Sequence, residues 1–193
     1  MTKLALLSVA VTVTLVAGCS HAPPPAPAKV AAPECQTGPE WTCFTSGPCP
    51  TPELKGMLCA VGTVENVSSM SLGRETAALK ARSEMASVVK TKVDGFRRAV
   101  QDSASKAGAG EESIQKIQAL SQATVDETLS GVSIPKAYYN EKLKVHFAMA
   151  ALDAKTFADA LRGLKQAGAL SDEVKKDIDA RAESVVSEWQ STK

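Results

Sequence analysis

The sequence predicts an α+β fold, a single domain in which a small, mostly antiparallel sheet of about three strands packs against one long helix. Three observations lead to this prediction. Residues 58–65 alternate in the period of a strand and include several β-branched side chains. The segment that follows, up to Gly108, carries apolar residues in helical period. Two further strand-like runs, 129–139 and 142–153, come later, and added helices end the chain.

The N-terminus has the layout of a secretory signal. Lys3 is followed by an apolar run from Leu4 to Ala17 and then by small residues. With about fifteen apolar residues, this run is shorter than the ~20 residues that a membrane-spanning helix needs. The segment ends in Leu15-Val16-Ala17-Gly18-Cys19, which resembles the lipobox of bacterial lipoproteins, where cleavage precedes a cysteine that becomes lipidated. We therefore predict a signal peptide over residues 1–18 and a lipid anchor on Cys19. The alternative is a signal peptide with an accidental cysteine.

Residues 19–34 are predicted to form a tether behind the anchor. Five prolines lie among residues 20–33, and they favour extended polyproline geometry at roughly 3.1 Å per residue. Such a segment holds a domain up to ~40 Å from the lipid. The residue after the cysteine is Ser20, not aspartate. By resemblance to the sorting pattern of enteric bacteria, this indicates the outer membrane, with the domain in the periplasm.

The predicted mature chain keeps four cysteines besides the lipidated one: Cys35, Cys43, Cys49 and Cys59. Because a secretory signal leads to an oxidising compartment, the even number predicts two disulfides. We favour either Cys35–Cys49 with Cys43–Cys59, or Cys35–Cys43 with Cys49–Cys59. Both pairings would fasten the segment 35–57 to the first strand. A zinc site is the competing interpretation, but no two of these cysteines have the short gap of structural zinc sites.

The long helix is the best defined element of the predicted core, residues 58–152. Its apolar stripe consists of Ala78, Ala81, Met85, Val89, Val93, Phe96 and Val100. Small residues occupy the N-terminal part of the stripe and allow close contact with a sheet. We expect the bulkier residues to fill the wider space where a twisted sheet falls away. Gly108 and Gly110 predict the end of the helix.

The second half of the core predicts a shorter helix, 111–124, and the two later strands. Asn140-Glu141 would form a two-residue turn between these strands. Pro135 predicts a bulge or an edge position. In the last strand Leu143, Val145, Phe147 and Met149 alternate with Lys144, His146, Ala148 and Ala150, the pattern of a half-buried strand. We therefore expect His146 on the outward face, in solvent, without a catalytic or ligand role.

Residues 153–193 are predicted as a helical extension. Asp153 is a good N-cap for its first helix, and Gly168 would end that helix. Ser171 would cap the last helix, whose apolar stripe consists of Val174, Ile178, Val185 and Trp189. This helix either folds back on the domain or projects to bind a partner, and we expect it to pack on the domain.

Together these features resemble the Lpp-twenty family of bacterial outer-membrane lipoproteins over residues 58–152. The matching residues are Ala60-Val61-Gly62, Ser71-Leu72, Arg74, Ala77-Ala78, Ala81-Arg82-Ser83-Glu84-Met85-Ala86, Leu129-Ser130-Gly131 and Tyr138-Tyr139. The four-cysteine segment and the C-terminal helices depart from the family pattern. The resemblance implies an envelope lipoprotein and supplies no catalytic residues.

Composition narrows the expected function further. Loss of Lys3 with the signal peptide leaves 21 basic and 21 acidic residues, and only 4% of the chain is aromatic. Nucleic-acid binding is therefore not expected, since it needs clustered cations or stacking rings. We expect a lipid-anchored envelope protein without catalysis, cofactor or metal, held to the membrane through Cys19 and contacting other envelope proteins or itself. The alternatives are a tethered periplasmic regulator of a cell-wall enzyme, and an enzyme or metal protein built on the cysteines and His146.

Overall fold

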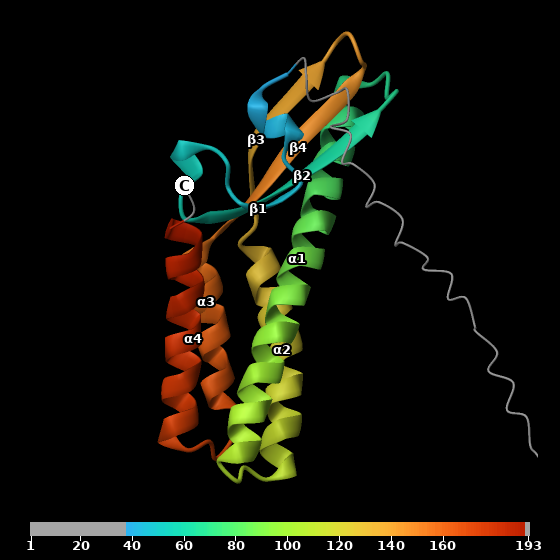
Figure 1. The fold of residues 1–193 in the computed structure, drawn as a ribbon. Coiled ribbons are helices and arrows are strands. Elements are labelled where there is room, and N and C mark those ends of the chain that lie inside the picture. The colour runs from blue at the N-terminus through green and yellow to red at the C-terminus, as the bar shows by residue number, and fades with distance from the viewer. Residues whose placement is uncertain (1–37, 192–193) are drawn as a thin grey trace, which may run out of the picture. The chain divides into compact units, whose positions relative to one another are not determined.

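The computed structural model describes residues 38–191, which belong to one compact unit. Four strands form one antiparallel sheet in the order β1-β2-β4-β3 (Figure 1). The strands are β1 (Ser46–Pro48), β2 (Met57–Glu65), β3 (Ser133–Asn140) and β4 (Val145–Asp153). The α+β prediction is confirmed. The structure adds a short strand, β1, which comes from the cysteine-rich segment.

Four α-helices complete the fold: α1 (Met70–Lys106), α2 (Glu111–Ser130), α3 (Ala154–Arg162) and α4 (Asp172–Ser191). The short 3-10 helices are η2 (Glu40–Cys43), η3 (Pro52–Leu54) and η4 (Gly163–Gln166). With 37 residues, α1 is ~55 Å long at 1.5 Å per residue. Its first half covers one face of the sheet, and its second half runs beyond the sheet beside the other helices (Figure 1). No helix among the described residues is long and apolar enough to cross a membrane.

The bounds of α1 follow from local sequence. The Leu72 amide donates to Ser69 Oγ at 3.4 Å, which caps the first turn. Gly108 adopts φ +77° just beyond the last turn, a conformation that glycine reaches without strain. The buried stripe consists of Gly73, Ala77, Ala81, Met85, Val89, Val93, Phe96, Val100 and Ala104. Ala77 rather than Ala78 is therefore the fully buried alanine of the second turn.

The change from small to bulky residues along α1 coincides with a change in what packs against the helix. The small residues face the sheet, since a side chain on Gly62 of β2 would collide with the backbone of α1 at Ala81. The bulky residues share one core with α2, α3 and α4. Larger side chains suit this part because helices pack 8–10 Å apart, axis to axis.

Both faces of β4 are buried, so the prediction of a half-buried strand is wrong. Ala148 and Ala150 belong to the core beneath α1, whereas Phe147 and Met149 belong to a second apolar cluster with Trp41. The cysteine-rich segment supplies the cover for this second face. His146 is consequently buried rather than solvent-facing, with 3% of its surface exposed.

Two predicted boundaries also shift. The second helix extends to Ser130, so β3 begins at Ser133 and not at Leu129. The turn between β3 and β4 contains four residues, 141–144, instead of two, and Lys144 has φ +54°. The prediction for Pro135 is confirmed, because β3 is an edge strand with a register irregularity between Ser133 and Lys136.

The C-terminal helices pack on the domain as expected. Asp153 Oδ2 accepts a hydrogen bond from the Thr156 amide at 2.8 Å, which confirms the predicted cap. The Ser171 hydroxyl accepts one from the Val174 amide at 3.3 Å at the start of α4. Trp189 is 1% exposed and stacks on Phe157, with ring centroids 5.4 Å apart. The alternative of a projecting last helix is therefore wrong.

Candidate functional site

The predicted lipidation residue, Cys19, lies outside the described residues, and so does Cys35. Cys49 and Cys59 form a disulfide with their Cα atoms 4.9 Å apart. The pairing Cys35–Cys49 with Cys43–Cys59 is therefore wrong, and this bond belongs to the other favoured pairing. The two cysteines meet because β1 pairs with β2, and the Cys49 amide donates to the Met57 carbonyl at 3.0 Å just beyond β1.

This disulfide fastens a cover over the second face of the sheet. Trp41, at the start of the covering segment, is buried against the strands, and Phe44 and Leu54 pack beside it. In the chain-entropy model, a loop closed by a bond between residues ten apart stabilises a fold by about 2–3 kcal/mol. The cover is thus a structural part of the domain, and the cysteines that form it are not available for redox or metal chemistry while bonded.

His146 lies under the first turn of α1. Its ring lies 4.4 Å from the ring of Tyr139, centroid to centroid, and a Cβ on Gly73 would fall 2.2 Å from its Nε2. Nε2 is buried without a hydrogen-bond partner. A cavity of about 60 Å³ beside it is lined by Met70, Arg74, Ala137, Tyr138, Tyr139 and Phe147. None of these residues is a serine, cysteine or carboxylate, so the cavity offers His146 no partner for nucleophilic catalysis.

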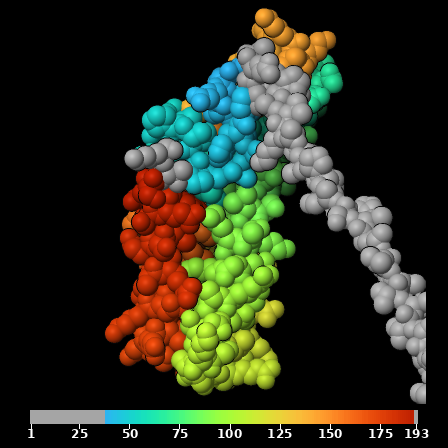
Figure 2. All heavy atoms as spheres, viewed as in Figure 1, coloured from blue at the N-terminus to red at the C-terminus, as the bar shows by residue number. Residues whose placement is uncertain are grey.

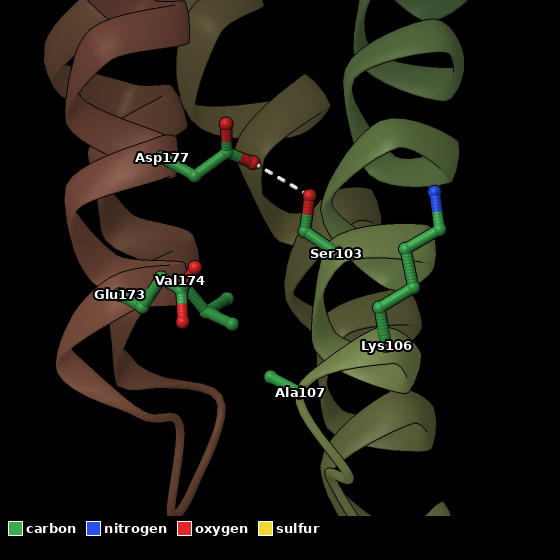
Figure 3. A pocket seen from close by; sticks show the side chains of 6 residues that line it. All are labelled: Ser103, Lys106, Ala107, Glu173, Val174 and Asp177. Carbon is green, nitrogen blue, oxygen red and sulfur yellow. Dashed lines mark hydrogen bonds between the residues drawn. The ribbon is translucent and has the colours of Figure 1, made fainter.

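Two hollows lie along the seam between α1 and α4, and we call them together the groove. Near the end of α1 it encloses about 270 Å³ beside Ser103 and Asp177, whose side chains point toward one another (Figure 3). Further along it encloses about 340 Å³ over an apolar floor of Phe96, Phe157, Leu161 and Val185. The wall on α1 consists of small residues four apart: Gly95, Ala99, Ser103 and Ala107. A groove with this lining fits a helix or an apolar side chain of a partner better than a reacting small molecule.

One polar bridge divides this groove. Asp177 Oδ2 accepts hydrogen bonds from Arg181 Nε at 2.7 Å and from Ser103 Oγ at 2.8 Å. The Arg181 guanidinium, and after it the Ser103 hydroxyl, hold the pKa of the Asp177 carboxyl below its ordinary value. A carboxylate with a lowered pKa stays ionised at neutral pH, so it acts as a fixed acceptor rather than as a proton donor.

The end of the sheet at the β3–β4 turn presents apolar side chains to solvent. We call this surface the sheet tip and define it as residues 66–72 and 141–144. Met70 is 48% exposed, Leu72 55% and Leu143 37%. The sequence prediction missed this surface because it placed residues 142–144 inside a strand. The signal available in the sequence was Lys142-Leu143-Lys144, an apolar residue between two lysines beside a predicted turn.

Comparison of the chain with models of known protein families and with characterised proteins finds no match. Within residues 38–191, no group of three or more histidine, cysteine, aspartate or glutamate side chains could hold a metal ion. The groove between α1 and α4 and the sheet tip are the two surfaces on which we base a functional interpretation.

Proposed function

We propose that this protein is a lipid-anchored component of the bacterial cell envelope that works by contact with other envelope proteins and not by catalysis. The observation that carries the proposal is the sequence Leu15-Val16-Ala17-Gly18-Cys19, followed at once by the proline-rich tether. Ser20 and the resemblance to the Lpp-twenty family favour the outer membrane. The domain then lies in the periplasm.

The disulfide between Cys49 and Cys59 supports this location. Stable disulfides belong to oxidising compartments such as the periplasm and are rare in the cytosol. The tether predicted at residues 19–34 would also keep the domain close to its neighbours in the membrane. A domain held in this way contacts its neighbours at a high effective concentration, which allows individually weak contacts to suffice.

The groove between α1 and α4 is the surface that we assign to protein contact. Its apolar floor includes Phe96 and Phe157, and its small-residue wall allows a partner backbone to approach α1 closely. Lys92 and Arg181 on its rim already have acidic partners, Glu188 at 3.6 Å and Asp177 at 2.7 Å. Binding here therefore relies on apolar packing, with little gained from new ion pairs.

A second function is a tethered regulator that activates or positions a cell-wall enzyme. The predicted reach of ~40 Å for residues 20–33 motivates it, because a scaffold at the membrane surface needs no such length. Shortening this segment should abolish the phenotype of a regulator that reaches across the periplasm. If the shortened protein keeps its full phenotype, the regulator is excluded.

The deciding experiment is crosslinking of the lipidated protein in its own membrane, with Cys19→Ser as the unanchored control. A photo-crosslinking residue replaces Ser184, which lines the groove. In the matched control it replaces Ser105, an exposed serine on α1 that is not part of the lining. We expect a defined protein partner from position 184 with the lipidated form only. A partner captured equally by both positions, or turnover of a cell-wall substrate by the purified mature protein, would contradict the proposal.

A further inference from the structure

We propose that the sheet tip lies against the lipid bilayer, with Met70, Leu72 and Leu143 inserted among the lipids. This inference rests on the lipid anchor proposed above and adds to it a second, protein-made contact with the same membrane. The partner is the phospholipid surface, recognised by exposed apolar side chains with flanking cations. Residues 66–72 and 141–144 form the contact.

Large apolar side chains are exposed at one end of the domain. Among the described residues, those with more than a third of their surface exposed are Met70, Leu72, Leu79 and Leu143. Met70, Leu72 and Leu143 belong to the sheet tip, whereas Leu79 lies further along α1. Exposed apolar side chains gathered in one place mark a surface that another phase or molecule covers.

Three cations at this end lack the ion pairs that the cations of α2 and α3 make. On those two helices Lys116 pairs with Glu112 at 2.6 Å, and Lys155 pairs with Asp159 at 2.8 Å. No ion pair within residues 38–191 involves Arg74, Lys142 or Lys144. Lysines beside an inserted leucine extend their charged ends to lipid phosphates while their methylene groups lie along the apolar region.

Acidic residues limit the electrostatic part of this contact. Glu65, Glu75 and Glu141 are also exposed at the same end of the domain, so the local charge is nearly balanced. Insertion of the apolar side chains, not attraction to anionic lipid, must then supply the stabilisation. The contact is therefore expected to survive high salt, which distinguishes it from adsorption of a basic surface.

The two segments of the tip lie close to the first residue that the structure describes. The Asn66 amide donates to the Lys144 carbonyl at 3.1 Å, which joins the two segments of the tip. The two segments lie together at the end of the sheet away from α2, α3 and α4 (Figures 1 and 2). Gly38, where the description begins, lies beside Tyr138 of β3, since a Cβ there would fall 2.9 Å from that ring. The described part of the chain therefore begins close to the surface that we assign to the bilayer.

Fluorescence quenching in vesicles tests the inference. The full-length lipidated protein is reconstituted into vesicles of phosphatidylethanolamine and phosphatidylglycerol that contain brominated acyl chains. Leu143→Trp and Leu72→Trp place a reporter in the tip, and Ser105→Trp places one near the far end of α1 as a control. The unsubstituted protein, with Trp41 and Trp189 buried, gives the background to subtract.

We expect brominated lipid to quench about half of the fluorescence that the added tryptophan contributes at each tip position, because interfacial side chains lie ~5–10 Å deep. The fluorescence contributed by the tryptophan of Ser105→Trp should not change. Raising the salt concentration should not restore the emission. Quenching of the tip by aqueous iodide instead of lipid would overturn the inference, as would protection from both quenchers, which would indicate a protein cover such as a second copy.

The mass of each purified variant separates this inference from the proposed function. If Cys19 carries its lipid and the tip is not quenched by brominated lipid, the membrane contact is wrong and the anchor stands. If Cys19 carries no lipid, the anchor is wrong and the membrane contact falls with it. Circular dichroism of each variant checks folding, and two independent tip positions guard against a local effect of one substitution.

Discussion

Replacing Gly62 by alanine should destabilise the domain more than any other single-methyl change in the sheet. A Cβ on Gly62 would lie 2.2 Å from the Ala81 nitrogen, 2.5 Å from the Ala77 oxygen and 2.7 Å from the Lys80 carbonyl carbon. All three atoms belong to the backbone of α1, so no side chain can rotate away. Either α1 or β2 must move to accept the methyl group.

The size of the effect follows from these distances. The shortest contact is 0.8 Å inside the 3.0 Å below which real Cβ contacts essentially never fall. A movement of that size would disturb the packing of Ala77 and Ala81, both fully buried on the sheet. Overpacking of a well-filled core costs typically 1–3 kcal/mol. Because the obstacle here is backbone, we expect a loss of about 3 kcal/mol or more.

Urea unfolding followed by tryptophan fluorescence measures this loss, because Trp189 and Trp41 belong to the two separate apolar clusters of the domain. The matched control is Gly95→Ala in the exposed part of α1, where the added Cβ meets no atom within 4 Å. That change should stabilise the helix by roughly 0.5–1 kcal/mol. If Gly62→Ala lowers the free energy of unfolding by less than the Gly95→Ala change raises it, the packing described for β2 and α1 is wrong.

Three further predictions concern the free energy of unfolding. Gly73→Ala should lower the free energy of unfolding, because the added methyl group collides with the His146 imidazole. In a double-mutant cycle, adding His146→Ala should recover ~1–2 kcal/mol of that free energy. If the effects of the two substitutions simply add, the contact between Gly73 and His146 is refuted. Removing the disulfide with Cys49→Ala and Cys59→Ala should lower the free energy of unfolding in urea by about 2–3 kcal/mol. If the midpoint of the urea unfolding transition does not change, the disulfide is not formed. The lowered pKa of Asp177 adds stability that is fully present above pH ~3.9, the ordinary pKa, and that is lost as the pH falls through the lower pKa of the folded state. Asp177→Asn should therefore make the free energy of unfolding fall less steeply at acid pH. An unchanged dependence on pH would contradict the hydrogen bonds assigned to Asp177.

The sequence predicts much of this fold because its strongest patterns are local. The helical stripe of α1 and the caps at Asp153 and Ser171 depend on residues a few positions apart, and periodicity reads such spacing directly. The end of α1 also depends on local sequence, because Gly108 adopts without strain the positive φ that ends the helix. These elements appear in the structure where the pattern places them.

Features that depend on a second layer could not be predicted. The burial of His146 requires knowing that α1 covers one face of β4 and the cysteine-rich segment the other. Alternation in sequence does not distinguish one covered face from two when the residues are alanines. The strand β1 was not predicted for the same reason. It is three residues long and forms because Cys49 and its neighbours lie against β2.

The candidate surfaces were also beyond sequence reasoning, for a different reason. The groove between α1 and α4 joins residues such as Ser103 and Asp177, 74 positions apart, which no local pattern connects. The sheet tip was missed because residues 142–144 were assigned to a strand, so Leu143 was counted with the core. Only the four-residue turn of the structure brings that leucine to the surface with lysines on both sides.

The most direct test of this account is the mass of the N-terminal peptide of the protein purified from its own membrane. We expect a chain that begins at Cys19 and carries a thioether-linked diacylglycerol and an acylated amine, with Cys19→Ser released into the soluble fraction. A chain that keeps residues 1–18, or an unmodified Cys19 in membrane-bound protein, would contradict it.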